Sequence, residues 1–378
     1  MIIDTISIIV AAGIICFAIL ASLMNPLLRK PRQRQPAEAD CPPLSLVITT
    51  HSDADSLERT LPLWLAQDYP ADLQIIVVTE KGDSQAEDVI KRLAGDRRLY
   101  TTFVPLTSRY MSRGKLAVTL GVKAARHEWV MLTRADCAPD TPKCLRQLAV
   151  HCADTNTDLV MGYTHLGDDS KAYHRFEQFY RAFYLLRKAS TGTACTTQMG
   201  SLMFKKGQFM EAGGYQGNLH LIHGEYDFLV NKLARKGNTA VSLDADSQIT
   251  RQAPSCRSRR TQLVNDYEVG RHLGHAGWLH TCYIFDQSML HLSYWAIIAT
   301  TAWGIVSQQW IVYGAAAIAL IITLVLRIYI AAKAIKLVKE RFAAWRVIPY
   351  ELRLVWRDLA TRIRHMRTDK SDFTTHKQ

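Results

Sequence analysis

Three long apolar stretches divide this chain of 378 residues into two polar regions. Residues 5–24 carry no charged side chain, and residues 289–306 and 310–332 form the second and third runs. About twenty consecutive apolar residues are enough for a helix to cross a bilayer. The pattern therefore predicts an N-terminal membrane anchor and, toward the C-terminus, a membrane hairpin.

Between the first and second runs, short β-branched segments alternate with segments of helical spacing. The predicted strands cover residues 44–50, 73–78, 99–104, 129–133, 158–163, 240–243 and 248–250. The predicted helices cover residues 57–67, 86–93, 116–124, 141–152, 176–188 and 262–273. This alternation predicts a parallel sheet covered on both faces. The aromatic stripe of the 176–188 helix is a sugar platform or a packing face, and packing is the commoner reason.

The net charge of +12 gathers beside the apolar runs, at residues 29–34 and from Lys333 to the C-terminus. Basic flanks mark the cytoplasmic ends of membrane spans, so this placement favours a membrane over nucleic acid as the partner. It predicts an N-terminus outside, with the large polar region and the C-terminus in the cytoplasm. A cleaved signal peptide is the alternative for the first run, but only Asp4 and no basic residue precedes it.

Five weaker signals complete the pattern. Arg327 lies near the inner end of the third run, where its side chain is expected to snorkel to the interface. Residues 350–366 mix apolar and basic side chains and are expected to lie on the membrane surface. Residues 251–260 predict a basic loop, and the C-terminal dozen residues predict disorder. The eight cysteines show no CxxC pair, which predicts free thiols.

Candidate chemistry lies at two acidic places in the polar region. The buried strand at 129–133 ends in Arg134-Ala135-Asp136, and ligands of open α/β sheets bind beyond the carboxyl ends of the strands. Glu225 and Asp227 open a helical segment about ninety residues later. Acidic side chains also cap helix N-termini for purely structural reasons. Taken alone, the second pair therefore carries no function.

The order of these motifs resembles the family 2 glycosyltransferases of GT-A fold. The resemblance rests on Gly114-Lys115 opening a helix, Asp136 at a strand end before a proline, Gly213-Gly214-Tyr215, and Arg271-His272. It covers roughly residues 44–275 and implies an α/β, Rossmann-like mixed sheet with helices on both faces, joined here to transmembrane helices. One position departs from the family's Asp-x-Asp pattern, because Arg134 stands in the place of the first aspartate.

The resemblance also implies a reaction and its residues. It implies an inverting transfer from a nucleotide-sugar to a lipid-linked or glycan acceptor, with Glu225, or otherwise Asp227, as the general base. Its donor-binding positions fall on Thr49, Glu80, Lys115, Arg134, Asp136, Arg271 and His272. A weakly held Mg²⁺ or Mn²⁺ would bind Asp136. An arginine at 134 would take over part of the metal's charge, or would pair with Asp136 and make donor binding nearly independent of metal.

The predicted organisation has five parts: an anchor at 1–24, a Pro-rich basic linker at 25–43, a GT-A domain at 44–285, a hairpin at 286–332 and a basic cytoplasmic tail at 333–378. The leading interpretation is a multi-pass glycosyltransferase of the inner cell membrane with its catalytic domain in the cytoplasm. The drift at Arg134 leaves an alternative open, a non-catalytic scaffold subunit that keeps the fold. Nucleotide binding with and without Mn²⁺ would separate the two.

Overall fold

The computed structural model describes residues 5–33, 41–51, 53–105, 111–274 and 276–374. Part of the predicted linker, residues 34–40, lies outside this range. The chain divides into two compact units. A helical unit comprises residues 1–30 and 277–358, and an α/β unit comprises residues 31–276 and 359–378. Residues 359–374 therefore cluster with the α/β unit by their contacts.

A seven-stranded sheet forms the middle of the α/β unit, in the order β3-β2-β1-β4-β8-β6-β9. Its strands are β1 Leu44–Thr49, β2 Leu73–Glu80, β3 Leu99–Val104, β4 Trp129–Arg134, β6 Leu159–Gly162, β8 Leu202–Lys205 and β9 Thr239–Ser242. All neighbours are parallel except β8, which runs antiparallel to both β4 and β6. The sheet is therefore mixed, as the family resemblance implied, and not parallel throughout, as strand–helix alternation alone had predicted.

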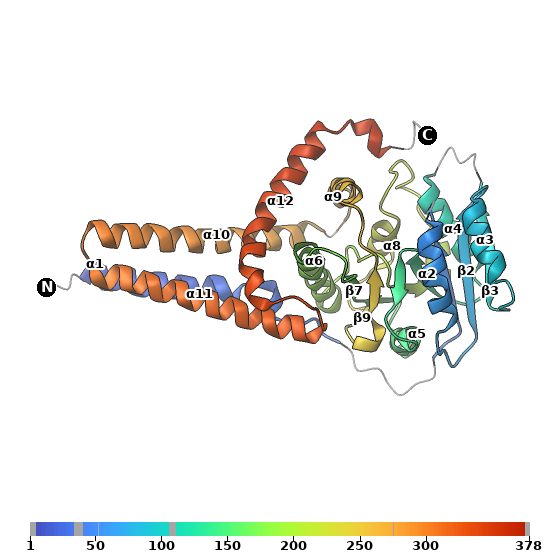
Figure 1. Ribbon diagram of the computed structural model, residues 1–378, viewed down its shortest axis with the longest axis horizontal. Helices are drawn as coiled ribbons and strands as arrows, with labels where there is room; N and C mark the ends of the chain where they lie inside the picture. The colour runs from blue at the N-terminus through green and yellow to red at the C-terminus, as the bar shows by residue number, and fades with distance from the viewer. Residues whose placement is uncertain (1–4, 34–40, 52, 106–110, 275, 375–378) are drawn as a thin grey trace. The chain divides into compact units, whose positions relative to one another are not determined.

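Helices cover both faces of this sheet, as Figure 1 shows around β2 and β3. Leu46 and Ile48 of β1 pack in one core with Leu57 of α2, while Val47 on the opposite face contacts Gly121 of α4. This two-sided burial explains why the strands read as continuous apolar runs. The helices of the unit are α2 Ala54–Leu65, α3 Ser84–Arg92, α4 Arg113–Ala124, α5 Cys144–Ala149, α6 Ala172–Thr191, α7 Lys206–Glu211, α8 Glu225–Leu233 and α9 Cys256–Arg271.

A second, three-stranded sheet lies in the order β5-β10-β7. Its strands are β5 Cys137–Pro139, β10 Ile249–Arg251 and β7 Thr164–Leu166. Arg251 pairs opposite Cys137 in this sheet, so the expected basic loop at 251–260 is wrong. Its first residue belongs to a strand, and the residues from Cys256 onward form the first turns of α9.

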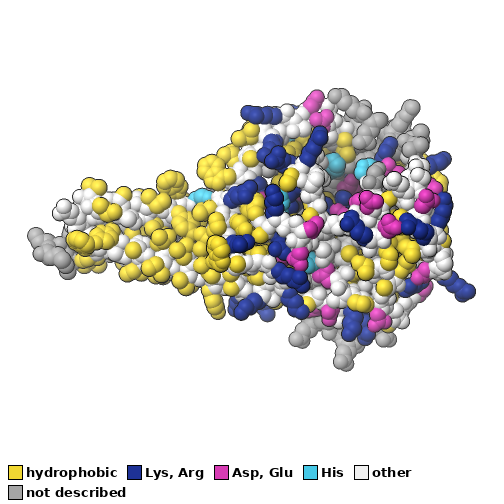
Figure 2. Space-filling model, viewed as in Figure 1, with side chains coloured by type: hydrophobic (Ala, Val, Ile, Leu, Met, Phe, Trp, Pro, Cys, Tyr) yellow, Lys and Arg dark blue, Asp and Glu magenta, His cyan; other side chains and the backbone are white. Residues whose placement is uncertain are grey.

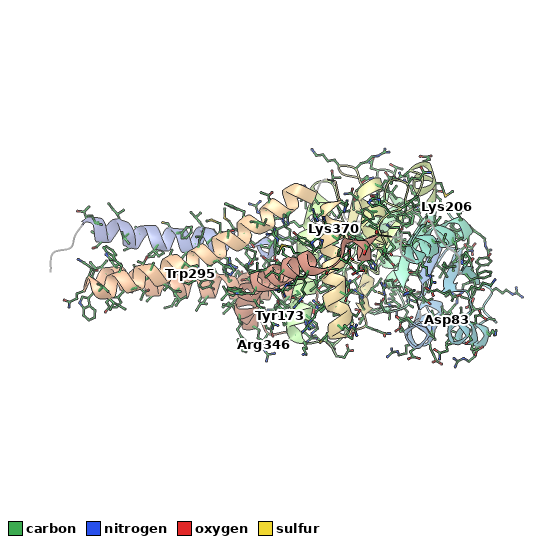
Figure 3. All side chains as sticks on the ribbon, turned by 90° about the horizontal axis from the view of Figure 1, so that it is seen from above. Asp83, Tyr173, Lys206, Trp295, Arg346 and Lys370 are labelled. Carbon is green, nitrogen blue, oxygen red and sulfur yellow. The ribbon has the colours of Figure 1, made fainter. Side chains whose placement is uncertain are left out.

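Within the described part of the chain, three helices are long and apolar enough to cross a membrane, and all three lie in the helical unit. They are α1 Thr5–Leu23, α10 Ala276–Val306 and α11 Trp310–Leu337. Ala18 of α1, Ile297 of α10 and Ala319 of α11 are buried in one apolar cluster. Hydrophobic side chains cover the outer surface of these helices in Figure 2, and Trp295 projects from α10 in Figure 3. A fourth helix, α12 Val347–Arg367, begins in this unit and ends in the other.

Arg327 does not snorkel. Its side chain and that of Glu351 on α12 are each 1% exposed, and Nη1 of Arg327 lies 2.6 Å from Oε2 of Glu351. Nη2 of Arg327 also donates to the carbonyl of Ala21 in α1, and Oε1 of Glu351 accepts from the Asn25 side chain at 2.8 Å. An internal carboxylate pairs with the guanidinium, which the run of residues 310–332 alone could not indicate.

Two further expectations on the α/β unit have clear outcomes. The aromatic stripe of α6 packs inward, since Phe176, Phe179, Tyr180 and Phe183 are all buried, which confirms packing over a sugar platform. The C-terminal residues are not disordered through Thr374, because Lys370–Phe373 form a 3₁₀ turn and Thr374 makes a β-bridge to Leu221. Residues 375–378 lie outside the described range.

All eight cysteines are free, as predicted.

Candidate active site

The carboxyl ends of three adjacent parallel strands bring the predicted donor-side residues to one edge of the large sheet. In the register of these strands, Thr49 at the end of β1 pairs with Arg134 at the end of β4. On its other side Thr49 pairs with Val78 of β2, two residues before Glu80. Asp136 follows β4 directly. The strand register therefore brings these side chains to the same edge of the sheet, where ligands of open α/β sheets bind.

Glu80 connects this edge to the helix behind it. Its Oε2 lies 3.2 Å from Nη1 of Arg113, the first residue of α4, and its Oε1 binds Nδ1 of His51. The carboxylate is 15% exposed. Glu80 thus faces solvent at the strand end while fixing the start of α4, the helix that carries Gly114 and Lys115.

Asp136 is held between two arginines. Nε of Arg134 lies 3.1 Å from Oδ1 of Asp136, and Nε of Arg251 lies 2.9 Å from Oδ2. The predicted pairing of Arg134 with Asp136 is confirmed, and Arg251 is a second partner that the sequence did not reveal. Burial alone would raise the pKa of Asp136, but the two guanidinium groups outweigh it and hold the pKa at about 2.

This arrangement does not fit the divalent cation that the fold family implies. A cation at Asp136 would need free carboxylate oxygens and further oxygen ligands around it, and both oxygens already accept hydrogen bonds from fixed positive charges. Among the described residues, no three His, Cys, Asp or Glu side chains are grouped so that they could hold a metal ion. The geometry therefore does not support a weakly held Mg²⁺ or Mn²⁺ at Asp136.

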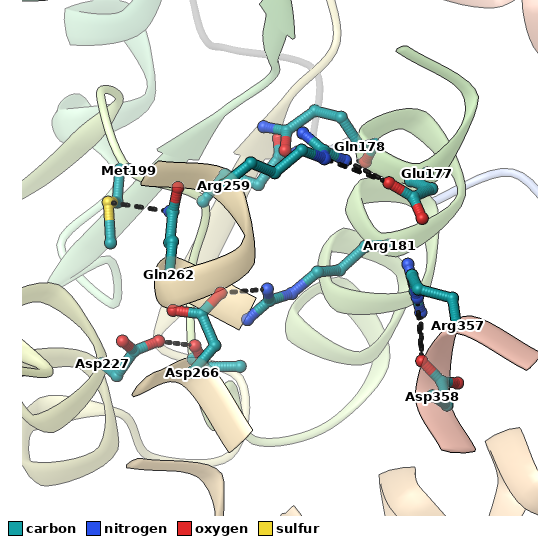
Figure 4. Close-up of polar contacts among 12 residues, drawn as sticks. Glu177, Gln178, Arg181, Met199, Asp227, Arg259, Gln262, Asp266, Arg357 and Asp358 are labelled. Carbon is teal, nitrogen blue, oxygen red and sulfur yellow. Dashed lines mark hydrogen bonds and ion pairs between the residues drawn. The ribbon is translucent and has the colours of Figure 1, made fainter. Parts of the chain in front are cut away.

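Arg251 is the main residue that sequence reasoning missed. Its side chain is 9% exposed, and Nη2 lies 3.5 Å from Oε1 of Gln262 in α9. Nε2 of Gln262 in turn donates to the sulfur of Met199 at 3.7 Å (Figure 4), and Nη1 of Arg134 lies 4.0 Å from the same sulfur. Only the pairing of β10 with β5 brings Arg251 beside Asp136, and an arginine ending a three-residue strand leaves no sequence signal.

Lys115 lies where the structure gives its amino group no access to a phosphate. The residue is fully buried, and Nζ donates to the carbonyls of Asn218 and Leu221 at 2.7 and 2.5 Å. The ammonium also lies over the Phe228 ring, 4.9 Å from its centroid. Burial lowers the pKa of Lys115 to about 8, with a smaller opposing effect from Glu225. In this conformation Lys115 fixes the loop that precedes α8, in place of the donor contact that the resemblance implied.

Glu225 begins α8 and packs directly against the start of α4. A β-carbon at position 114 would displace the Glu225 carboxyl group from its present position, so glycine permits this close approach. Gly224 has a φ of +95° and fixes the turn into the helix. The hydroxyl of Tyr215 donates to the Glu225 carbonyl at 2.8 Å. The Glu225 carboxylate thus meets the first turn of α4, where a helix favours negative charge.

Asp227 lies in a different environment, two residues further along the first turn of the same helix. It is 6% exposed and accepts a hydrogen bond from the Thr196 hydroxyl. Burial, with the nearby carboxylate of Asp266, raises the pKa of Asp227 to about 6, against the opposing effect of the Thr196 bond. Asp266 itself pairs with Arg181 of α6 at 2.5 Å (Figure 4). Asp227 is therefore enclosed by protein groups, whereas Glu225 faces the donor-side helix.

The end of α9 brings Arg271 and His272 beside the start of α8. Val269 lies so close to Gly224 that a β-carbon there would come within 2.9 Å of its Cγ1. Arg271 and His272 are exposed and contact Glu268 at 3.3 and 3.2 Å. Two ion pairs with α6 hold the helix in place, Arg259 with Glu177 and Asp266 with Arg181 (Figure 4). This arrangement leaves both basic side chains at the surface.

Comparisons with known proteins give one family and one fold. A model of the glycosyltransferase-like family 2 matches residues 42–294. The mannosyltransferase PcManGT from Pyrobaculum calidifontis, solved with GDP-Man and Mn²⁺, is 18% identical, with a TM-score of 0.57 over 96% of this chain and 98% of that one. Residues 1–349 of TarS from S. aureus are 13% identical, with a TM-score of 0.42 over 59% of this chain and 63% of that one. No curated protein matches. At this identity, PcManGT supports the fold alone.

Proposed function

Since the chain belongs to the glycosyltransferase-like family 2, it is a glycosyltransferase of GT-A fold that uses a nucleotide-sugar, and we propose that it transfers the sugar with inversion to a lipid-linked or glycan acceptor. Its three helices of membrane-spanning length and hydropathy support association with a membrane. Basic residues at 29–34 and after Lys333 support an orientation with the α/β unit in the cytoplasm.

One observation carries the proposal. The donor-side edge, with Thr49, Glu80 and Arg134 at neighbouring strand ends, follows from the strand register. Glu225 reaches the first turn of α4 from the other side, at Gly114, and Glu80 holds that same turn through Arg113. The first turn of α4 therefore contacts both the candidate base, Glu225, and a residue of the donor-side edge, Glu80.

In the proposed reaction, the Glu225 carboxylate takes the proton of the acceptor hydroxyl as that oxygen attacks the anomeric carbon of the donor sugar. The bond from the anomeric carbon to the diphosphate oxygen breaks on the opposite face, so the configuration inverts. The nucleoside diphosphate leaves with the electron pair of that bond. Glu225 supports this role better than Asp227, because Asp227 is enclosed with Thr196.

The departing diphosphate needs positive charge, and we assign this to arginines. The Arg134 side chain is 38% exposed while its Nε stays on Asp136, so the rest of the guanidinium remains available to the edge. Arg271 and His272 are exposed at the end of α9 and are proposed to hold the diphosphate from the acceptor side. Fixed guanidinium groups bind phosphate oxygens in pairs and need no reorganisation during the reaction.

The decisive test is transfer by the purified full chain, with a panel of UDP- and GDP-sugars offered to lipid-extract acceptors, in Mn²⁺ and in chelator. We expect one donor to be used at similar rates in both conditions. Glu225→Gln should abolish transfer while binding of that nucleotide persists. Failure of every nucleotide-sugar to bind would overturn the proposal, and would leave the scaffold alternative.

Orientation is tested by cysteine labelling. Cys137 and Cys195 are buried and would escape a reagent on either side of the membrane, whereas Cys256 is exposed. An impermeant maleimide should label Cys256 only after the cells are permeabilised. Labelling in intact cells would place the α/β unit outside. Cys256→Ser is the matched control for the labelled band.

A further inference from the structure

Helix α12 has an apolar face that no other segment among the described residues covers. Trp356, Leu359, Ile363 and Met366 are 68%, 46%, 36% and 74% exposed. Their spacing of three and four residues places them on one side of the helix. The opposite side carries Leu354 and Thr361, both buried. The helix is thus amphipathic with its apolar side turned outward, the reverse of a helix that covers a protein core.

The charges of α12 are divided in the same way. Arg362 and Arg364 are exposed on the two flanks of the apolar face, and Arg367 is exposed at its C-terminal end. The two acidic residues of the helix are both bound to protein groups: Glu351 to Arg327, and Asp358 to the Tyr283 hydroxyl at 2.6 Å. The outer side of α12 therefore presents apolar and basic groups together, which is the pattern of a helix that lies in the surface of an anionic membrane.

The start of α12 contacts α11 and the residues just after α1 at points where each of these two helices is long enough to have crossed the apolar core of a bilayer. Glu351 binds Arg327 of α11 and Asn25, just after α1. Arg327 is the eighteenth residue of α11 and donates to Ala21, the seventeenth residue of α1. At about 1.5 Å per residue these lengths correspond to roughly 25 Å, close to the thickness of the hydrocarbon core. Glu351 thus fixes the first turns of α12 at the inner interface.

We infer that the outer face of α12 is a binding surface for anionic phospholipid headgroups and the acyl chains beneath them. Trp356, Leu359, Ile363 and Met366 enter the acyl boundary, while Arg362, Arg364 and Arg367 contact lipid phosphates. The helix is not among the three that are apolar enough to cross a membrane, so it lies on the surface. The inference rests on the proposed membrane anchoring and extends it.

The test uses the full chain in nanodiscs, with an environment-sensitive fluorophore on one cysteine and nitroxide lipids as quenchers. The labelled positions are native Cys16 in α1, Ile363→Cys on the apolar face, and Lys91→Cys on α3. Each variant carries serine at the other accessible cysteines among Cys16, Cys256 and Cys282. We expect quenching at positions 16 and 363 but not at 91, and more quenching at 363 when phosphatidylglycerol is added to phosphatidylcholine.

Charge is tested in the same samples. Arg362→Gln, Arg364→Gln and Arg367→Gln together should lower the lipid-bound fraction at 363 in anionic discs, by roughly fivefold in the partition per arginine, and leave Cys16 unchanged. Quenching at 16 without any at 363 would overturn the inference but not the anchoring. Absence of quenching at both positions would overturn the anchoring as well. If quenching at position 363 changes neither with lipid charge nor with the three arginine substitutions, the proposal of a surface for anionic lipid is refuted.

A separate observation concerns the C-terminal hook, which we define as residues 365–374. His365 pairs with Glu268 of α9 at 2.6 Å and stacks on Phe373 with ring centroids 5.4 Å apart. The backbone of Phe373 then accepts a hydrogen bond from Ile222 at 3.0 Å. Ile222 belongs to the loop whose carbonyls bind Lys115. Lys115 inside and the hook outside therefore fix the short segment that leads into Glu225.

We propose that Phe373 is a positioning residue for Glu225, a role that rests on Glu225 being the base. Phe373→Ala should lower kcat about tenfold to a hundredfold, as misplacing a catalytic group does, and leave the KM for the donor unchanged. Phe373→Tyr should restore kcat if the stacked ring is what matters. Thermal unfolding of each variant shows whether the fold survives. If Glu225→Gln is inactive but Phe373→Ala keeps full kcat, the positioning role is wrong. If Glu225→Gln is active, the proposed base is wrong.

Discussion

Asp136 and Asp227 are both buried aspartates of the candidate site, yet their surroundings give them opposite properties. Asp136 accepts hydrogen bonds from two arginines, and its pKa is held at about 2. Asp227 has a hydroxyl partner and a carboxylate neighbour, and its pKa is raised to about 6. Asp136 therefore stays ionised down to strongly acidic pH, whereas Asp227 takes up a proton as the pH falls through about 6.

This difference separates structural from catalytic carboxylates. An aspartate neutralised by two guanidiniums is a poor base and a poor metal ligand, because its charge is already compensated. An aspartate enclosed by protein cannot reach an acceptor hydroxyl whatever its pKa. Glu225 differs from both, because its carboxylate lies against the first turn of α4 at Gly114. The comparison therefore favours Glu225 over Asp227 as the proposed base.

The largest expected effect tests that assignment. Glu225→Gln should lower kcat by about two to four orders of magnitude, because the amide cannot accept the acceptor's proton. Nucleotide affinity, measured by calorimetry, should stay within about twofold. Asp227→Asn is the matched control on the same helix, and its kcat should stay within about tenfold of wild type. A reversed order of these two variants would make Asp227 the base.

The next effect is on stability and concerns the two-arginine clamp. Arg251→Met leaves a buried Asp136 with one partner, and removing one member of a buried ion pair costs about 3 to 5 kcal/mol. Thermal unfolding in detergent should show the loss. The double variant Arg251→Met with Asp136→Leu should recover most of it, because the buried carboxylate is gone and Arg134, left without that partner, is 38% exposed to solvent. A single-variant loss below about 1 kcal/mol would show that the clamp is not structural.

Opposite pH dependences follow from the two aspartates. Asp227 has a raised folded pKa, about 6 against 3.8 for an ordinary aspartate, so the folded state binds its proton more tightly. Its contribution is complete below about pH 4 and is lost as the pH rises through 6, by roughly 3 kcal/mol. Asp136 has a lowered folded pKa, so its contribution is present above about pH 4 and is lost as the pH falls toward 2.

The two pH ranges do not overlap, so the contributions of Asp227 and Asp136 to stability can be measured separately. Wild-type unfolding temperatures should fall as the pH is raised from 4 to 6.5, and Asp227→Asn should remove most of that decline. Asp136 does not titrate in this range in the wild type, so it adds nothing to that decline. An unchanged slope in Asp227→Asn would mean that Asp227 titrates as an ordinary surface carboxylate.

Much of this fold was readable from the sequence, because it follows from periodicity. The runs at Leu44–Thr49, Leu73–Glu80 and Trp129–Arg134 are buried on both faces, so each appears as a continuous apolar segment between helical ones. The donor-side edge followed as well, since parallel strands align their ends. The antiparallel direction of Leu202–Lys205 could not be read, because strand direction leaves no trace in a four-residue pattern.

The partners of the charged residues were the unreadable part of the site. Arg251 meets Asp136 across 115 positions of sequence, and Arg327 meets Glu351 across 24. Lys115 was placed by its position beside Gly114, but the direction of its side chain depends on which carbonyls the loop at 218–221 presents to it. A sequence pattern predicts which face of a helix or strand a residue lies on. An ion pair also depends on which side chain the fold brings opposite that residue.

The smallest expected effect tests how completely Asp136 is neutralised. Arg134→Asp restores the Asp-Ala-Asp pattern at residues 134–136 and removes one of the two guanidiniums. Two unit charges near 4 Å interact by roughly 4 kcal/mol at an effective dielectric of 20, which is enough to exclude a weakly held ion. Arg251 still occupies Oδ2 of Asp136 in this variant, so the new site gains at most one free aspartate and one shared one.

Nucleotide affinity, compared in Mn²⁺ and in chelator, should be independent of metal for wild type. It should gain no more than about tenfold from Mn²⁺ in Arg134→Asp, which corresponds to about 1.4 kcal/mol. Adding Arg251→Gln should enlarge that gain if both arginines exclude the cation. A wild-type affinity that collapses in chelator would mean that the clamp opens when donor binds, and that Asp136 is a metal ligand after all.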